Sequence, residues 1–348
     1  MTVYTINPLT DVRWSELVDR HPKASVFHTR GWLQALEKTY GYTPVVFTTA
    51  APYECLQNGL ACCQIKSWIT GERLVSLPFS DHCDLLANSE SAASEILCCV
   101  REHILNTGFR YAEFRPTTSE CFLPQAANLE TSKHFFLHFL SLDQSLETLF
   151  CNLHKNCIQR KIRRAERERL TYKIGREALL CAFYELLVRT RRRHGLPPQP
   201  FEWFRNILKC LGNGATIRAA YLRQQPVSAI MTLSHGQTVV YKYACSDERH
   251  NQLGGPSLLL WKAIQEAKES GMKWLDLGRS DTDSPSLVIF KDRLGATKVP
   301  LQYYRYYSPA VSVPAEESQY RKRAQRLIPF LPDKILAIAG KLLYKHIG

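Results

Sequence analysis

The residues best suited to holding a phosphate lie in the run Gly254-Gly255-Pro256, which follows a polar loop. Glycines let the backbone approach a ligand closely, and proline is favoured at the first position of a helix. The free N–H groups and the dipole of a helix N-terminus suit a bound phosphate. Gly254 and Gly255 are therefore candidates for binding a phosphate-bearing cofactor, and an ordinary strand-to-helix turn is the alternative.

Asp276, Arg279 and Lys291 form a second group, suited to acting on an amine and an activated carbonyl. An attacking amine must lose a proton, so a carboxylate at the end of a strand, here Asp276, is a candidate base. Arg279 and Lys291 could bind phosphate or stabilise a developing oxyanion. We expect Arg279 in a loop at residues 279–283, where site residues are common. A solvated charge or a structural ion pair is the alternative for each residue.

Hydrophobic periodicity predicts alternating strands and helices around these residues. In the second half we expect helices at 177–193, 201–211 and 256–269, with strands at 216–222, 227–233, 238–244 and 274–277. In the first half we expect helices at 29–39 and 90–106, with strands at 44–49, 60–65 and 111–115. A strand at 134–139 and one long polar helix at 145–169 are expected between the halves.

The two halves repeat the same order of elements. Residues 107–116 parallel residues 270–279: each run has a glycine that ends a helix, then a basic residue, an aromatic residue and a strand carrying an acid. An ancient duplication explains this order. With a linker within 119–133, we expect an N-terminal domain at 1–133, a C-terminal domain at 134–308 and a separate tail at 309–348.

Composition indicates a globular protein of a reducing compartment. Its positive charge favours polyanions as partners, and a basic surface that serves only solubility is the alternative. The 348 residues are 45% hydrophobic and 22% charged, with a formal net charge of +13 and twelve cysteines. The N-terminus has no apolar signal core and no run of 18 apolar residues occurs, so we expect reduced thiols in the cytosol. Cys151, His154 and Cys157 lack a fourth ligand, so no metal site is expected.

Basic residues cluster in two helical segments. The first holds Lys155, Arg160, Lys161, Arg163, Arg164, Arg167 and Arg169, and the second holds Arg189 and Arg191–Arg193. Both could bind tRNA phosphates or a lipid pyrophosphate, and a solvated helix face is the alternative. Residues 334–347 predict an amphipathic C-terminal helix, which could rest on an anionic membrane or pack against the body of the protein.

Four runs resemble, in order, those of the Fem-type peptidoglycan aminoacyltransferases and their bacterial relatives with a GNAT-like (N-acetyltransferase-like) fold. They are Leu153-His-Lys-Asn156 with Ile162-Arg-Arg-Ala-Glu166, His194-Gly-Leu-Pro-Pro198, Tyr243-Ala-Cys-Ser246 with Asp276-Leu-Gly-Arg279, and Phe290-Lys291 with Gly295-Ala296. The resemblance is best across residues 140–307 and weaker across 25–120.

This resemblance implies an α/β fold of two tandem GNAT-like domains, with mixed, mostly antiparallel sheets flanked by helices and a cleft between the domains. It implies that Lys291 lies in the acceptor cleft. Lys291 and the candidate base Asp276 are the residues that we expect to be catalytic. The residues then expected to bind substrate are Arg279, Tyr243, His194 and Arg115. The donor is charged tRNA in Fem enzymes and acyl-CoA in other relatives. The paired helices that several Fem enzymes carry are not seen here, which leaves tRNA use open.

The sequence thus predicts a cytoplasmic acyltransferase, peripheral to the inner membrane face if the C-terminal helix binds lipid. It would transfer an activated group from acyl-CoA or aminoacyl-tRNA to an amine of a cell-envelope precursor, in peptidoglycan or exopolysaccharide synthesis. No covalent nucleophile is needed. The alternative is a non-catalytic binding protein with the same fold, holding tRNA or a lipid-linked pyrophosphate.

Overall fold

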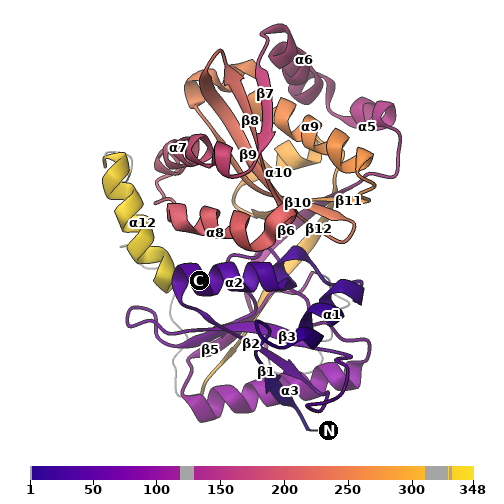
Figure 1. Cartoon of the computed structure of the whole chain (residues 1–348), viewed down its shortest axis with the longest axis vertical. Helices are drawn as coiled ribbons and strands as arrows, with labels where there is room; N and C mark the ends of the chain where they lie inside the picture. Colours follow the sequence, from indigo (N-terminus) through magenta and orange to yellow (C-terminus); the bar gives the residue numbers. More distant parts are fainter. Residues whose placement is uncertain (1, 118–128, 310–327, 329–330) are drawn as a thin grey trace. The chain divides into compact units, whose positions relative to one another are not determined.

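The computed structural model describes residues 2–117, 129–309, 328 and 331–348, and divides into two compact units (Figure 1). The N-terminal unit comprises the described residues of Met1–Leu137, Val299–Ala315 and Leu343–Gly348. The C-terminal unit comprises those of His138–Lys298 and Glu316–Leu342. Three elements have residues in both units: β6 (Glu130–Ser141), β12 (Thr297–Tyr307) and α12 (Asp333–Ile347).

The N-terminal unit is built on strands in the order β1-β2-β3-β4-β5-β12-β6. Its further strands are β1 (Tyr4–Ile6), β2 (Thr43–Thr48), β3 (Leu60–Ile65), β4 (Arg73–Val75) and β5 (Tyr111–Phe114). Neighbours from β1 to β4 are antiparallel, and β5 runs parallel to β4. The helices are α1 (Val12–Arg20), the 3-10 helix Val26–His28, α2 (Arg30–Tyr40) and α3 (Glu90–Thr107).

The C-terminal unit has strands in the order β6-β11-β10-β9-β8-β7. Its further strands are β7 (Thr171–Gly175), β8 (Ala215–Leu222), β9 (Gln225–His235), β10 (Thr238–Ser246) and β11 (Trp274–Asp281). The α-helices are α5 (Leu146–Asn152), α6 (Arg160–Arg167), α7 (Glu177–Arg193), α8 (Phe201–Leu211), α9 (Gly255–Glu269) and α10 (Pro285–Asp292). The shorter helical turns are Lys155–Gln159, Gly212–Gly214 and Glu248–Leu253.

Helices cover both faces of the C-terminal sheet. Helices α9 and α6 pack on one side of the sheet and α7 and α8 on the other (Figure 1). The α9 side buries a continuous apolar core that includes Ile162, Ile230 and Leu259. The other side is aromatic, because Phe204 packs edge-on against both Phe183 and Tyr243. The sheet is therefore held rigidly between two apolar layers, which fixes the ends of β10 and β11.

The repeat expected from the sequence is present in the topology of each unit. In one unit β2, β3 and β4 are antiparallel, and α3 then leads to β5 parallel to β4. In the other, β8, β9 and β10 are antiparallel, and α9 leads to β11 parallel to β10. Gly108 and Gly271, which end α3 and precede β11, both have positive φ angles, as a glycine after a helix favours. The α/β fold of two GNAT-like domains is confirmed.

One expected helix, at 145–169, is wrong as a continuous element. The structure breaks it between α5 and the turn Lys155–Gln159, because Leu153 is extended and the His154 N–H donates to the carbonyl of Arg293. The His154 ring accepts from the backbone N–H of Cys157 and so starts the next turn. A distant carbonyl thus overrides a helix-compatible local sequence.

Two other expectations differ at element boundaries, and the expected domain limits can be compared with the limits of the two units. The loop expected at 279–283 is wrong in part, since β11 continues through Arg279 to Asp281. Residues 130–133 of the expected linker belong to β6, and residues 118–128 lie outside the described part of the chain. The domain boundary expected at 133 and 134 lies beside the unit boundary at Leu137, but β12 contributes Val299 and later residues to the N-terminal unit. Two residues in the expected 309–348 tail, Asp333 and His346, pack in different units.

Candidate functional site

The pairing between β10 and β11 ends partway along both strands. Residues Thr238–Val240 of β10 pair in parallel with Trp274–Asp276 of β11, yet β10 continues to Ser246 and β11 to Asp281. Beyond Asp276 the backbone groups of β11 on this side need other partners. At the end of β10 a side-chain hydroxyl takes the place of a strand partner. Thr190 Oγ1 accepts from the Ser246 N–H at 3.0 Å and donates to the Ser246 carbonyl at 3.1 Å. The C-terminal unit therefore has two adjacent strands that pair only at their beginnings.

Lys291 binds the backbone of β11 where strand pairing has ended. Its side chain comes from α10 and is 3% exposed. The Nζ atom donates to the carbonyls of Gly278 at 2.8 Å and Arg279 at 2.9 Å. A buried ammonium held by two carbonyls fixes the course of β11 and places a positive charge beside it.

Asp276 shapes the same stretch of β11. The Asp276 side chain is buried, and its Oδ1 accepts from the Gly278 N–H at 2.7 Å. Gly278 has a φ of 70°, a conformation that residues with a Cβ rarely adopt. The Asp276-Leu-Gly-Arg279 run therefore has a structural role: it makes a local irregularity in β11 that turns two carbonyls toward Lys291. Asp276 and Lys291 thus both bind the backbone of Gly278, and Lys291 also binds the carbonyl of Arg279. The catalytic and substrate-binding roles expected for these residues stay predictions.

His138 in β6 is a neighbour of Lys291 that the sequence did not single out. Its ring is fully buried, and its Nε2 lies 3.2 Å from Asp292 Oδ1. Burial, and then the charge of Lys291, lower the pKa of His138, while Asp292 opposes that shift. Nδ1 is buried with no hydrogen-bond partner among the described residues. A lone histidine in an apolar strand pattern gives no sequence indication that a lysine lies beside it.

Gly254 and Gly255 are required by packing at the start of α9. A Cβ on Gly254 would lie 2.1 Å from the Lys161 carbonyl oxygen, and Gly254 has a φ of 83°. A Cβ on Gly255 would lie 2.3 Å from Ser228 Oγ. Close approach of α9 to α6 and β9 therefore explains both glycines without a ligand. Their predicted cofactor role stays a prediction.

Replacing Gly254 with alanine is expected to lower the free energy of unfolding by about 3 kcal/mol, since it adds backbone strain and a clash with a backbone oxygen. Gly271 is the matched control, because it has a φ of 74° and a Cβ there meets nothing within 4 Å. Gly271→Ala should therefore cost only about 1 kcal/mol for its backbone conformation. Urea unfolding of both variants measures the difference, and equal losses would contradict the packing explanation.

An arginine-rich pocket of about 670 Å³ lies at the end of β10, within the C-terminal unit. The end of α7, the end of β10 with the turn that follows it, and the start of α12 all contribute to its lining. The lining residues are Arg189, Arg192, Arg193, Ser246, Asp247, Glu248, Arg249 and Asp333. Four guanidinium groups around one space suit a phosphate or a carboxylate. Of the basic clusters noted in the sequence, this one forms a concave site.

Asp247 holds two of the four arginines in place. Its carboxylate is 4% exposed and lies 3.0 Å from Arg189 Nη1 and 2.5 Å from Arg249 Nη2. Hydrogen bonding from Arg249, opposed by burial, lowers the pKa of Asp247 to about 2. The carboxylate therefore stays ionised at any physiological pH and orients both guanidinium groups toward the pocket. Asp333 Oδ1 lies 2.8 Å from Arg192 Nη1, and Glu248 Oε2 lies 3.9 Å from Arg193 Nη1. Each of the four arginines therefore has a carboxylate partner, which a bound phosphate would join or displace.

The other predicted substrate-binding residues of this unit, Tyr243 and His194, contact different elements. Tyr243 is buried, and its hydroxyl accepts from Trp203 Nε1 at 2.8 Å, so it belongs to the aromatic layer under α8. His194 is exposed at the C-terminal end of α7, next to Arg193 of the pocket. Of the predicted site residues in this unit, Asp276 and Lys291 therefore share the β11 network, Tyr243 lies in the aromatic layer, and His194 follows a lining residue of the arginine pocket.

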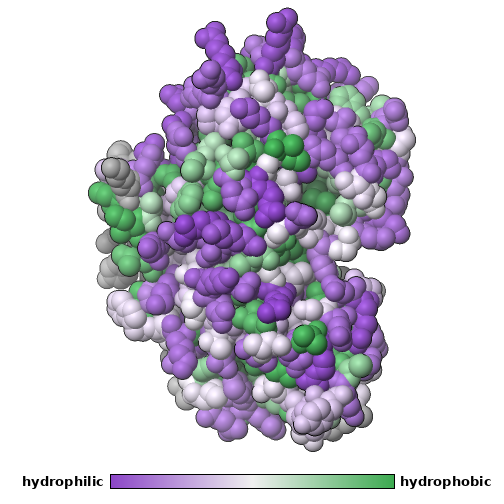
Figure 2. Space-filling view, viewed as in Figure 1, coloured by the Kyte–Doolittle hydropathy of each residue, from purple (hydrophilic) through white to green (hydrophobic). Residues whose placement is uncertain are grey.

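The basic segment around α6 forms a largely hydrophilic surface (Figure 2). Arg160, Lys161, Arg163 and Arg167 are exposed on this helix, and Ile162 and Ala165 face the core. This is the amphipathic arrangement of an ordinary surface helix. Binding of nucleic acid by this surface stays a prediction.

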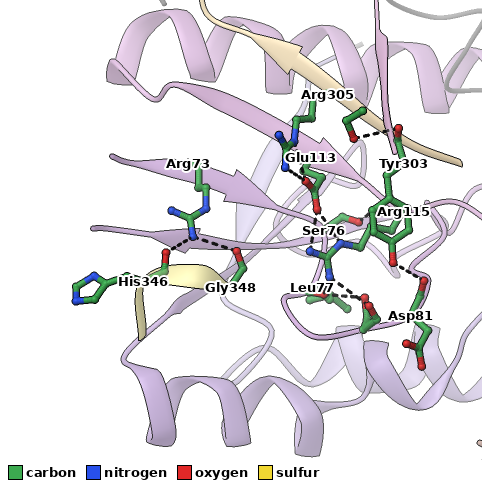
Figure 3. Close-up of polar contacts among 12 residues, drawn as sticks. Arg73, Ser76, Leu77, Asp81, Glu113, Arg115, Tyr303, Arg305, His346 and Gly348 are labelled. Atoms are coloured by element: carbon green, nitrogen blue, oxygen red, sulfur yellow. Dashed lines mark hydrogen bonds and ion pairs between the residues drawn. The ribbon is translucent and has the colours of Figure 1, made fainter. Parts of the chain in front are cut away.

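Arg115, predicted to bind substrate, is part of a buried ionic network in the N-terminal unit (Figure 3). It donates to Glu113 Oε1 through Nη2 at 2.8 Å, and its Nη1 donates to the carbonyls of Leu77 and Ser80. Arg305 Nη2 binds the other oxygen of Glu113 at 2.5 Å. Glu113 holds the place in β5 that Asp276 holds in β11. In this unit the equivalent acid is therefore saturated by two arginines, and Arg115 has its donors used by protein groups.

The described residues contain no helix long and apolar enough to cross a membrane, and no group of His, Cys, Asp and Glu side chains arranged to hold a metal.

Comparisons with known proteins agree with this architecture. Residues 153–285 match the family described as an acetyltransferase (GNAT) domain. No curated protein matches the chain in sequence. The crystal structure of FemX is similar over 88% of this chain and 97% of its own, with a TM-score of 0.69 at 14% identity.

Two further solved structures share the fold. The C-terminal domain of a putative lysylphosphatidylglycerol synthetase from Agrobacterium fabrum is similar over 86% of this chain and 90% of its own, with a TM-score of 0.57 at 11% identity. A tandem GNAT protein from the clavulanic acid biosynthesis pathway is similar over 89% of this chain and 99% of its own, with a TM-score of 0.58 at 10% identity. Residues 153–285 therefore match the acetyltransferase (GNAT) family, and the chain as a whole shares its fold with FemX.

Proposed function

We propose that this chain moves an activated acyl or aminoacyl group from a phosphate-bearing carrier to an amine, and that the C-terminal unit binds the donor. One observation carries the proposal. The strands β10 and β11 stop pairing at Val240 and Asp276, and an arginine-lined pocket lies where β10 ends. One unit therefore combines open strand edges with a site for negative charge.

These two features suit the two parts of an activated donor. Both acyl-CoA and aminoacyl-tRNA carry phosphates, and arginine binds phosphate through paired N–H groups. An extended arm can add to an open strand edge through its amide groups. With phosphate in the pocket, such an arm would run along β10 toward the beginning of β11.

The chemistry needs positioning more than covalent catalysis. The amine nitrogen attacks the donor carbonyl carbon, the bond from that carbon to the carrier sulfur or oxygen breaks, and the amine proton passes to a base. Holding both reactants in place supplies much of the rate in such reactions. Asp276 remains our candidate for the base, and His138 is a second titratable group in the same network. Lys291 keeps β11 in its course.

The N-terminal unit is less suited to the donor. Beyond the paired residues Val75 and Glu113, Arg115 donates to the carbonyls of Leu77 and Ser80. In this unit a buried arginine therefore binds carbonyls that follow β4, the counterpart of β10, whereas Lys291 of the C-terminal unit binds carbonyls of β11. We propose that this unit contributes to binding the acceptor, which we take to be an amine of a cell-envelope precursor in peptidoglycan or exopolysaccharide synthesis.

The name of one similar structure supports an acceptor in the cell envelope, but not its amine, because phosphatidylglycerol has hydroxyl groups and no amine. Lysylphosphatidylglycerol, in the name of the Agrobacterium fabrum domain, joins an amino acid to a membrane lipid. Aminoacyl transfer at the cytoplasmic membrane face is the corresponding proposal for this chain, with tRNA as one of two candidate carriers.

The pocket can be tested with Arg193→Gln combined with Arg249→Gln. Asp247 keeps Arg189 in this variant, so its carboxylate stays paired. Loss of two charge-assisted contacts is expected to raise the donor KM by about tenfold or more. Arg205→Gln is the matched control, since Arg205 is an exposed arginine on α8 outside the pocket. An unchanged donor KM in the double variant would rule out the pocket as the phosphate site.

A non-catalytic role is the other outcome of the same assay. If the chain binds a donor through the pocket but never consumes it with any amine, it is a binding protein with the acyltransferase fold.

A further inference from the structure

The C-terminal end of α12 is fixed to the N-terminal unit by a buried arginine (Figure 3). Arg73 is 2% exposed, and its Nη2 donates to the carbonyls of His346 at 2.8 Å and Gly348 at 3.1 Å. The Thr70 hydroxyl also donates to the His346 carbonyl, at 2.9 Å. Ser67 Oγ lies 3.0 Å from His346 Nδ1. The last turn of α12 is therefore held by the loop at residues 66–71 in a defined position.

The same loop presents apolar side chains to solvent. Trp68 is 88% exposed and Ile69 is 50% exposed, although large apolar side chains are usually covered. The Trp68 ring packs edge-on against His346, with ring centroids 5.6 Å apart, so it lies beside the end of α12. Leu343 and Ile347 of that turn are also exposed. Four exposed apolar side chains therefore gather around the anchored end of the helix.

Helix α12 itself is apolar on its solvent side. Ile335, Ile338 and Leu342 are exposed and recur at the spacing of one helix face, whereas Leu336 is buried. Figure 2 shows hydrophobic residues gathered over this helix. Packing of one face of α12 onto the protein, an alternative left open by the sequence, thus accounts for Leu336 but leaves the exposed face unexplained.

Positive charges border these apolar residues. Lys66 precedes Trp68 in the loop, and Lys341 and Lys345 lie on α12; all three are exposed. The whole chain has a formal net charge of +13. An apolar surface edged by lysines, with an exposed indole, complements an anionic bilayer: the apolar groups enter the headgroup region and the lysines meet lipid phosphates.

We infer that Trp68, Ile69, Leu343 and Ile347, with Lys66 and Lys345 beside them, form a docking surface for an anionic lipid bilayer. The bordering charge favours lipid over a second copy of this chain, because two copies would bring their lysines together. The inference goes beyond the proposed acyl transfer and does not depend on it. Anchoring by Arg73 means that the surface exists before lipid binds.

Vesicle co-sedimentation of the full chain tests the surface. Vesicles containing phosphatidylglycerol should bind the protein, and vesicles of phosphatidylcholine alone should bind it at least about tenfold more weakly, with binding lost as salt is raised to about 1 M. Trp68→Ser should reduce partitioning onto phosphatidylglycerol vesicles about tenfold. Leu105→Ser is the matched control: Leu105 on α3 is 48% exposed and lies outside the surface.

Three results would overturn the inference: no binding to either vesicle, equal binding to both, or equal effects of Trp68→Ser and Leu105→Ser. Sedimentation of the free protein as a dimer that Trp68→Ser dissociates would instead assign the surface to self-association. Acyl transfer to a water-soluble amine should be unchanged in Trp68→Ser. A failure of membrane docking is thereby distinguished from a failure of the proposed chemistry.

Discussion

Lys291→Met is expected to lower kcat for acyl transfer by about 100-fold while leaving the donor KM nearly unchanged. Methionine keeps an unbranched apolar chain but removes the ammonium that binds the carbonyls of Gly278 and Arg279. Without these two hydrogen bonds, the backbone at Gly278 and Arg279 would move, and the donor carbonyl beside it would be held less well in position for attack. The arginine pocket has none of these residues in its lining, so donor binding should survive.

The measurement is steady-state kinetics with a saturating amine, alongside urea unfolding of each variant. Two carbonyls left without their donor should cost about 1–3 kcal/mol of stability, which the unfolding curve reports separately. Lys298→Met is the matched control. It removes a lysine that is more exposed and whose Nζ makes a long, 3.5 Å ion pair with Asp292 Oδ2. If Lys291→Met has the same kcat as the wild-type chain, Lys291 has no role in the reaction.

Glu113→Gln is expected to lower the free energy of unfolding by about 3–5 kcal/mol. The carboxylate is almost fully buried and pairs with both Arg115 and Arg305. Glutamine has the same shape but leaves two guanidinium groups without a counter-charge. Glu102→Gln on the exposed side of α3 is the control, and should change stability by about 0.5 kcal/mol or less.

The effect of Glu113→Gln should also depend on pH. Burial by itself would raise the pKa of Glu113, but Arg115 and Arg305 outweigh it and hold the pKa at about 2, below the ordinary value of 4.5. A depressed pKa in the folded state means that the carboxylate stabilises the fold fully above about pH 4.5 and loses that contribution as the pH falls toward 2. Urea unfolding at pH 7 and at about pH 3 should show the difference between wild type and variant shrinking in acid. A pH-independent difference would show that the ion pairs are not its source.

Local patterns predicted most of the elements. Apolar periodicity located α2, α3, α7, α8 and α9 within a residue or two at each end. Gly108 and Gly271 marked the two strand entries that revealed the repeat. These features depend on short-range periodicity and on glycine conformation, both of which a single sequence carries.

The missed features depend on contacts between distant residues. The helix break at His154 needs the Arg293 carbonyl, and the position of Lys291 depends on α10, a helix that the sequence did not indicate. The burial of His138 beside Lys291 and the gathering of arginines around Asp247 likewise join segments far apart in the chain. Arg115 was predicted to bind substrate, but it pairs with a buried glutamate that it shares with Arg305 of β12.

The most direct test of donor transfer by the C-terminal unit compares two donors in parallel with one amine acceptor. Free thiol from acetyl-CoA and loss of aminoacyl-tRNA are followed with the wild-type chain and with Arg193→Gln/Arg249→Gln. We predict that at least one donor is consumed only when the amine is present, giving an acylated amine by mass spectrometry, and that the double variant needs about tenfold more of that donor. The account would be contradicted if neither donor is consumed with any of a range of amines. It would also be contradicted if the double variant needs no more donor than the wild-type chain.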